Sequence, residues 1–193
     1  KGDWVKPFKK RNTAPQPFHL ANGQKVQVPM MSQTSRFELL GTKTYRALRL
    51  PYKGGRVVMD AILPKKKGTI KAVEKELASK GFQIPPFGLG KEKVMLSLPK
   101  FKMGRRVELA KVLASMGMKR AFDRTKADFT GITPPIKEGF YIGEVIHKAV
   151  CEVDERGTKA AAATAVLMAK GAGAPTRPKV FRVDRPFMMV IRD

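Results

Sequence analysis

Few side chains in this sequence have the chemistry of a catalytic or metal-binding site. Cys151 is the single cysteine, and the two histidines, His19 and His147, lie far apart along the chain. A single cysteine cannot form an internal disulfide and has no CxxC partner, and two distant histidines are a weak set of metal ligands. The sequence therefore predicts no metal site.

The side chains with the largest collective effect are basic. The chain has 39 Lys and Arg against 16 Asp and Glu, a formal net charge of +23, and such an excess produces a positive field that attracts polyanions. The cations stand in short groups such as Lys65-Lys66-Lys67 and Arg105-Arg106, without a zinc-finger spacing or another nucleic-acid motif beside them. Two explanations of the basic residues stay open: a face that binds heparin or nucleic acid, and an ordinary solvated surface.

One segment departs from this basic background. Residues 157–175, GTKAAAATAVLMAKGAGAP, are rich in alanine, have glycines on either side of the main alanine run and carry only two charges. A helix, a flexible linker and a strand that is not always in place could each explain the segment. Alanine favours a helix, but a short helix between glycines is marginal unless it packs on something, and this one has no apolar face.

Alternation favours the strand. Counted by twos, one side of the segment carries only small or apolar residues, and Lys159 falls on the other side. Such a strand could slide between two others, because small side chains impose little steric demand and the charge stays in solvent. The residues of the first side are Thr158, Ala160, Ala162, Thr164, Val166 and Met168.

The rest of the chain can build the structure that such a strand would enter. Its 193 residues and 42% hydrophobic content suffice for a buried core and predict one domain, or at most two. No apolar stretch reaches the roughly 18 residues of a membrane span, and we expect no signal peptide in this chain. We expect a soluble protein, with an extracellular or periplasmic location favoured.

Hydrophobic periodicity predicts both strands and helices. Helical spacing indicates two amphipathic helices, one over 69–81 with Thr69 as its N-cap and one over 105–117 that stops at Gly117. Alternation and apolar runs indicate strands at 24–31, 93–103 and 143–155, and a hairpin over 44–63 that turns at Gly54-Gly55.

Six stretches can be read as motifs, in this order along the chain: KGDWVKPF at the start, KVQVPMM at 25–31, LPKF at 98–101, DFTGIT at 128–133, VIHKAVCEVDERGTKAAAATAVLMA at 145–169 and VFRVDRPFMMVIRD at 180–193. Together they resemble the serpin family of serine protease inhibitors, and the resemblance covers essentially the whole chain.

The resemblance implies the α+β serpin fold, with large mixed β-sheets, packed helices and an exposed reactive-centre loop. In this sequence the loop would span about residues 156–180, and residues 1–193 would form part of a single serpin domain. We expect the chain to lack the N-terminal part and the last strand of that fold, so the remaining serpin segments would be partners of this one.

The resemblance also implies a function, inhibition of a serine protease by a suicide substrate. The protease cleaves the loop, and the loop then inserts into the main sheet of a metastable inhibitor before the acyl-enzyme can hydrolyse. The inhibitor is not an enzyme, because it supplies the bait and no nucleophile, and it needs no cofactor. Two alternatives stay open: a non-inhibitory serpin that acts as a carrier, chaperone or storage protein, and a basic polyanion-binding protein on a serpin scaffold.

The residues of the loop can be carried over from the family. The hinge would consist of Gly157, Thr158, Lys159, Ala160, Ala161, Ala162 and Ala163, with Arg156 standing where the family often has an acidic residue. The reactive-site bond falls among Lys170, Gly171 and Ala172. We expect cleavage between Lys170 and Gly171, by a trypsin-like protease, with an elastase- or subtilisin-like one as the alternative.

Four further residues match positions that control the opening of the sheet in the family. Glu155 would pair with Lys100, His147 would hold strands together below the opening sheet, and Trp4 would lie near the point where the loop enters. The plainer interpretations are two unrelated surface charges for the pair, a satisfied core histidine, and a large core aromatic.

Overall fold

The computed structural model describes residues 2–88, 90–132, 139–158 and 177–193. The contacts divide the chain into two compact units. Unit 1 comprises residues 1–101 and 152–193, and unit 2 comprises residues 102–151. This division does not test the expectation that the chain is part of a single domain, which stays a prediction.

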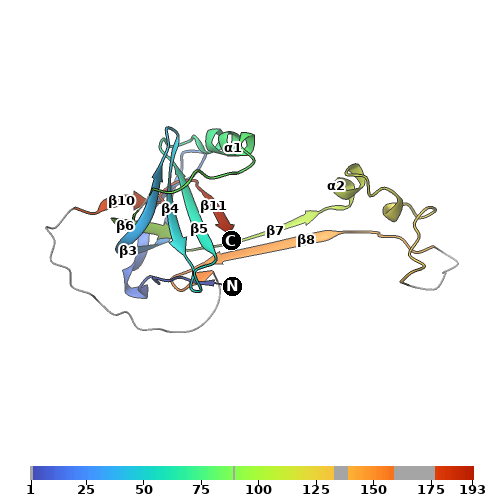
Figure 1. The fold of residues 1–193 in the computed structure, drawn as a ribbon, viewed down its shortest axis with the longest axis horizontal. Coiled ribbons are helices and arrows are strands. Elements are labelled where there is room, and N and C mark those ends of the chain that lie inside the picture. The colour runs from blue at the N-terminus through green and yellow to red at the C-terminus, as the bar shows by residue number, and fades with distance from the viewer. Residues whose placement is uncertain (1, 89, 133–138, 159–176) are drawn as a thin grey trace. The chain divides into compact units, whose positions relative to one another are not determined.

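A seven-stranded sheet, counted over the described residues, forms the body of unit 1. Its order is β10-β6-β3-β4-β5-β11, with β2 attached to β3 (Figure 1). Only β10 runs parallel to its neighbour, β6. The strands are β2 (Thr13–His19), β3 (Lys25–Gly41), β4 (Tyr45–Pro51), β5 (Val58–Pro64), β6 (Glu92–Pro99), β10 (Lys179–Arg182) and β11 (Met188–Arg192).

Strand β3 extends the predicted strand at 24–31 to 17 residues, because it changes partner twice. Its first part pairs with β2, its middle with β6 and its last four residues with β4. The predicted hairpin at 44–63 is confirmed as β4 and β5, and both Gly54 and Gly55 have positive φ, at 91° and 73°. Glycine adopts this backbone region without steric cost.

The core of unit 1 lies on β4 and β5. Strand β5 is buried on both faces from Met59 to Pro64, as expected of a nearly continuous apolar run inside a sheet. One core cluster joins Tyr45, Ala47 and Ile62 of the sheet to Val73 and Leu77 of helix α1 (Ile70–Ser79). The helix was predicted from the spacing of its apolar residues, and two of these residues, Val73 and Leu77, are the ones that pack into the core.

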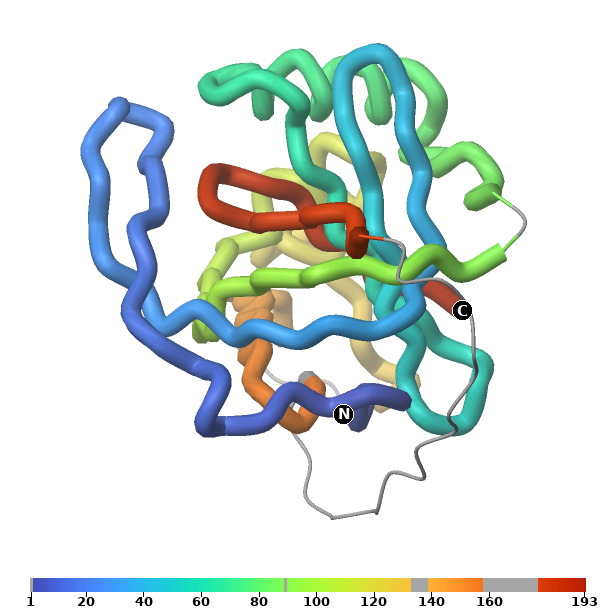
Figure 2. The backbone as a smooth tube through the Cα atoms, turned by 90° about the vertical axis from the view of Figure 1, so that its left-hand side faces the viewer, coloured from blue at the N-terminus to red at the C-terminus, as the bar shows by residue number. Residues whose placement is uncertain are grey.

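Helix α1 confirms the prediction of a helix over 69–81 but not of its cap. Thr69 stands at the N-cap position, yet its hydroxyl donates to the carbonyl oxygen of Lys66 at 2.7 Å and caps no helical amide. Figure 2 shows this helix at one end of unit 1, and the segment from residue 177 onward (red), which supplies β10 and β11. The C-terminal segment is therefore integrated into the sheet.

A second sheet has the order β1-β9-β8-β7. Its strands are β1 (Gly2–Asp3), β9 (Gly157–Thr158), β8 (Ile146–Val153) and β7 (Phe101–Glu108). The predicted strand at 143–155 is confirmed as β8 with shorter ends. The predicted strand at 93–103 is in fact divided, because β6 ends at Pro99 and β7 belongs to the other sheet.

Unit 2 corrects the prediction of a helix over 105–117. Residues up to Glu108 belong to β7, and helix α2 covers only Ala110–Ser115, followed by Gly117 with φ 113° and the 3-10 turn η2 (Arg120–Phe122). A second 3-10 turn, η1 (Lys10–Asn12), precedes β2 in unit 1. None of the helices in the described part of the chain is long and apolar enough to cross a membrane.

Candidate functional site

The predicted hinge begins in a tight turn at the end of β8. Asp154 makes this turn, because its backbone amide donates to the carbonyl of Gly157 at 3.0 Å and its carboxylate Oδ1 accepts from the amides of Arg156 and Gly157, at 2.8 and 3.1 Å. An aspartate that bonds the backbone amides ahead of it is typical of turns. The chain then enters β9, where Thr158 faces Val153 of β8.

The start of the chain closes this turn from the other side. Gly2 and Asp3 of β1 pair antiparallel with Thr158 and Gly157 of β9. A Cβ atom at Gly157 would lie 2.0 Å from the carbonyl oxygen of Gly2, which no real side chain tolerates. Glycine is required at this hinge position because β1 approaches so closely.

Glu155 is the buried charge of the site. Its side chain is 7% exposed, and its two carboxylate oxygens have separate donors. Lys100 Nζ lies 2.9 Å from Oε2, and the Thr13 hydroxyl donates to Oε1 at 2.9 Å. Burial raises the pKa of Glu155. The hydrogen bonds that its carboxylate accepts from Lys100, from the backbone and from Thr13 lower the pKa by more, so it lies below its ordinary value. The carboxylate stays ionised and fixed to β2 and to the segment after β6.

Trp4 locks the same turn through its indole and its backbone. The indole Nε1 donates to the carbonyl of Asp154 at 3.0 Å, and the backbone amide donates to the carbonyl of Arg156 at 2.8 Å. Trp4 as a whole is 1% exposed, and its ring stacks on Tyr52 with the ring centroids 4.6 Å apart. Trp4 is thus a core aromatic and also a direct contact of the turn before the predicted hinge. The two interpretations offered from the sequence, a core aromatic and a residue near the start of the loop, therefore do not exclude each other.

The structure therefore brings together Trp4, Lys100 and Glu155, and places Gly157 and Thr158 beside them. His147 is exposed on β8 in unit 2 and makes no hydrogen bond or ion pair within the described residues. The remaining hinge residues, Lys159 and Ala160 to Ala163, and the reactive-site residues Lys170, Gly171 and Ala172, lie outside the described residues. Their roles stay predictions.

Two residues of the site were not found from the sequence. Asp154 had a signal, because it stands three residues before a glycine, as in many turns. Thr13 had none, since it reaches Glu155 across 142 positions of sequence. Within the described residues no group of three or more histidine, cysteine, aspartate or glutamate side chains could hold a metal ion.

Comparison with known proteins identifies the family of the chain. The family model described as serpin, serine protease inhibitor, matches residues 1–193. An uncharacterized serpin-like protein of Thermococcus kodakarensis is 40% identical over the whole chain, which covers 44% of that protein. Serpin48 of the insect Tenebrio molitor superposes with a TM-score of 0.79 at 30% identity, over all of this chain and 50% of its own.

A further structural relative is human thyroxine-binding globulin bound to its ligand. It superposes with a TM-score of 0.77 at 29% identity, over 99% of this chain and 49% of its own. The chain thus spans about half the length of the relatives it matches. The match over all 193 residues, together with the predicted fold, settles the family: the chain belongs to the serpins.

Proposed function

We propose that this chain carries the hinge and reactive-centre loop of an inhibitor that traps a serine protease as a suicide substrate. One observation supports the proposal most directly. The ionised Glu155, held by Lys100 and Thr13, anchors the turn immediately before a segment of alternating small residues. The anchor defines where a cleaved loop would start to insert, and the small residues allow its insertion.

The composition of the loop suits two environments. Before cleavage the segment has to be stable in water, and afterwards it has to fit between strands, where it gains a ladder of hydrogen bonds and buries alternate side chains. Residues 158–170 as a strand would span about 43 Å, at about 3.3 Å per residue. That length is sufficient to move a tethered protease from one end of a domain to the other.

The target class depends on the cleaved bond. A protease with an acidic primary pocket would cut after Lys170, because a cation in such a pocket discriminates more strongly than a glycine can. We therefore propose a trypsin-like target. A protease with a small apolar pocket, elastase- or subtilisin-like, would accept Ala169, Gly171 or Ala172 instead.

The test is the formation of a covalent complex by the full-length protein. It is incubated with trypsin, and an SDS-stable complex is sought, with the released peptide sequenced by mass spectrometry. We expect a peptide that starts at Gly171. A loop that is cleaved without any stable complex would contradict inhibition.

A matched pair of variants tests the insertion step. Ala160→Arg places a cation on the side of the strand that would be buried, whereas Ala161→Arg places it on the opposite side. Burying an unpaired charge is costly, so the first variant should become a substrate that is cleaved without trapping, and the second should still trap. Equal trapping by both variants would show that the loop does not insert in this register.

A carrier function is the second candidate, favoured by the similarity to thyroxine-binding globulin. A non-inhibitory serpin would be cleaved without forming a complex, and cleavage would leave its thermal midpoint unchanged.

Polyanion binding is a third candidate that the net charge of +23 supports. It predicts retention on a heparin column that falls steeply with salt.

A further inference from the structure

Unit 1 contains a cavity that the hinge does not use, at the turn that joins β5 to α1. Its volume is about 330 Å³, which falls within the range of small-ligand sites, about 300–1,000 Å³. The turn, residues 185–186 and the hairpin between β2 and β3 surround it, and Figure 2 shows all three on one side of unit 1. We call it the basic cavity, because its lining within the described residues includes no acidic residue and three cations, Lys66, Lys71 and Arg185.

Backbone contacts hold the β5–α1 turn in place. The amide of Lys65 donates to the carbonyl of Thr44 at 2.9 Å, and the Thr69 hydroxyl donates to the carbonyl of Lys66 at 2.7 Å. Gly68 has φ 76°, a conformation that glycine adopts without steric cost. The wall of the basic cavity is therefore formed before a ligand arrives, and binding does not have to order this turn.

A histidine links the same turn to the other two walls. Lys67 Nζ lies 3.0 Å from His19 Nε2, and His19 Nδ1 lies 3.2 Å from the carbonyl oxygen of Asp184. An ammonium group can only donate, so Nε2 accepts and the proton of the neutral ring lies on Nδ1, which donates to the carbonyl. The turn, the end of β2 and the segment around residue 184 are thus joined.

The two lysines of the basic cavity lack a counter-charge. The side chains of Lys66 and Lys71 are exposed and make no hydrogen bond or ion pair within the described residues. Arg185 is compensated by Asp184, at 2.7 Å, and its Nε and Nη2 donate to the carbonyl of Pro64 at 3.1 and 2.8 Å. Among the described residues, two of the five N–H groups of this fixed guanidinium therefore have no acceptor.

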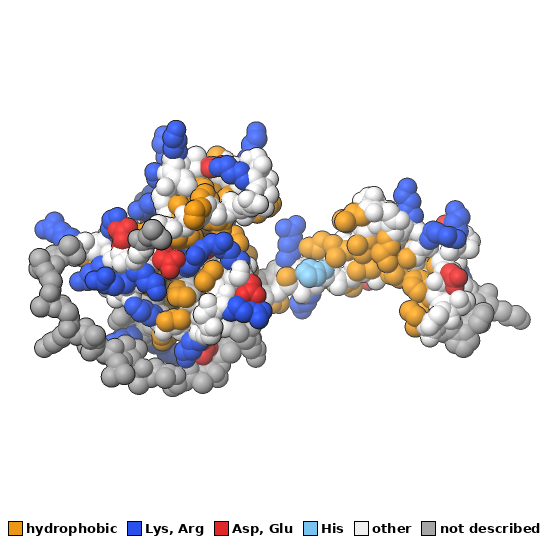
Figure 3. All heavy atoms as spheres, viewed as in Figure 1, with side chains coloured by type: hydrophobic (Ala, Val, Ile, Leu, Met, Phe, Trp, Pro, Cys, Tyr) orange, Lys and Arg blue, Asp and Glu red, His pale blue; other side chains and the backbone are white. Residues whose placement is uncertain are grey.

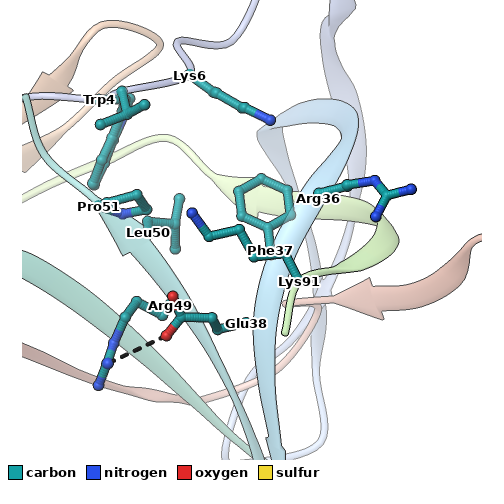
Figure 4. Close-up of a pocket in the computed structure, with 10 residues that line it drawn as sticks. Trp4, Lys6, Arg36, Phe37, Glu38, Arg49, Leu50, Pro51 and Lys91 are labelled. Carbon is teal, nitrogen blue, oxygen red and sulfur yellow. Dashed lines mark hydrogen bonds and ion pairs between the residues drawn. The ribbon is translucent and has the colours of Figure 1, made fainter. Parts of the chain in front are cut away.

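A smaller cavity beside Trp4 lacks these properties (Figure 4). Its volume is about 50 Å³, which leaves room for only a few water molecules. Trp4, Phe37 and Leu50 in its walls are 1–3% exposed and belong to the core. The acidic residue that lines it, Glu38, is paired with Arg49 at 3.3 Å. We therefore assign no ligand to this smaller cavity.

We propose that the basic cavity binds a sulfate group of a sulfated polysaccharide. Lys66 and Lys71 supply uncompensated charge, and Arg185 supplies N–H donors in a fixed position. Lys65, exposed on the same turn, adds charge for the next anionic group of the polysaccharide. The proposal gives a site to polyanion binding, the third candidate function above, and rests on that candidate. It does not depend on inhibition of a protease.

The other walls of the basic cavity favour a polysaccharide over a nucleic acid. They include small aliphatic residues and prolines, Ala21, Pro64, Ile70 and Pro186, and no aromatic ring within the described residues. Proteins that bind single-stranded nucleic acids usually stack the bases on aromatic side chains. The basic cavity offers charge without such a stacking surface.

The first test compares three probes titrated into the full-length protein by calorimetry in about 0.15 M salt. They are a heparin hexasaccharide, the same hexasaccharide after chemical removal of its sulfates, and a single-stranded DNA oligonucleotide with the charge of the first. Heparin should bind at least about tenfold more tightly than either of the others. Equal binding of the desulfated probe would overturn the role of sulfate, and equal binding of the DNA would overturn the choice of a polysaccharide.

Two charge-matched double variants locate the site. Lys66→Gln with Lys71→Gln should weaken the heparin hexasaccharide about tenfold and reduce the slope of log Kd against log salt by about 2. Lys9→Gln with Lys10→Gln removes the same charge and should change the affinity by less than about twofold. The control lysines are separated from His19 by the length of β2, about 20 Å. All four lysines are exposed, so both variants should fold.

The outcomes separate the site from the function on which it rests. Equal weakening by the two double variants would assign binding to net charge, which overturns the site and leaves polyanion binding in place. A parent protein that does not bind the heparin hexasaccharide would overturn both. Weakening confined to the variant at Lys66 and Lys71 would support the basic cavity as the site.

Discussion

The two units of the chain bury their apolar side chains very differently. Every residue of the buried hydrophobic core, from Trp4 to Val183, belongs to unit 1. In unit 2 no described residue is buried, although the unit carries large exposed apolar side chains such as Met103, Met116 and Val150. Figure 3 shows apolar side chains (orange) gathered on the visible face of this part of the chain.

The difference indicates where the stability of the chain resides. Unit 1 closes a core between β4, β5 and α1, and the hinge turn belongs to the same unit. Unit 2 has no comparable core among its described residues, so its own contacts supply little of the free energy of folding. Substitutions that are matched in chemistry should therefore have unequal effects in the two units.

The largest effect is expected at the buried ion cluster of unit 1. Asp60→Ala leaves Arg49 and Arg192 without their buried partner and should lower the free energy of unfolding by about 3–5 kcal/mol. In unit 2, Glu144→Ala removes an exposed ion pair with Arg106 at 3.7 Å and should cost less than about 1 kcal/mol. Urea unfolding of the full-length variants measures both. Similar losses would remove the distinction between the units.

The next effect concerns apolar packing. Ile62→Ala opens a cavity in the core cluster of unit 1 and should cost about 2–5 kcal/mol. Met116→Ala in unit 2, where Met116 is 78% exposed, should change stability by less than about 0.5 kcal/mol. Thermal melting of the two variants separates these expectations. A loss at Met116 as large as that at Ile62 would show that this side chain is covered in the full-length protein.

The same contrast explains what could be predicted from the sequence. Helix α1 and the β4–β5 hairpin were predicted because apolar spacing and Gly54-Gly55 are local signals whose side chains do become core and turn. The prediction of a helix over 105–117 was wrong, because the spacing of Val107 and Leu109 fits a strand as well as a helix. The chain forms strand β7 up to Glu108, and helix α2 begins only at Ala110. Among the described residues of unit 2, no buried side chain distinguishes the two periods.

The site was predicted unevenly for a similar reason. Glu155, Lys100 and Trp4 were identified through motifs that resemble the family, and the structure places them in contact with one turn. Thr13 could not be found, because it lies on β2 and meets Glu155 only across 142 positions of sequence. Long-range pairing of strands leaves no local pattern in a sequence.

The smallest effect is a dependence of stability on pH that is specific to the hinge in unit 1. The pKa of Glu155 lies below its ordinary value in the folded chain, so the unfolded chain binds its proton more readily. The stabilisation by Glu155 is therefore present above the unfolded pKa, near 4.3, and is lost as the pH falls through the lower folded pKa. Urea midpoints measured from about pH 6 down to about pH 3 should fall less steeply in Glu155→Gln than in the parent protein.

Glu74→Gln is the matched control for this prediction, because Glu74 is exposed on α1 and the same change there removes a carboxylate without an ion-pair partner among the described residues. Its pH profile should follow that of the parent protein. At neutral pH, Glu155→Gln should also cost about 1–3 kcal/mol, since the buried oxygens lose a charge-assisted hydrogen bond from Lys100. If Glu155→Gln kept the parent's slope below pH 5, the Lys100–Glu155 pair would not be what anchors the hinge.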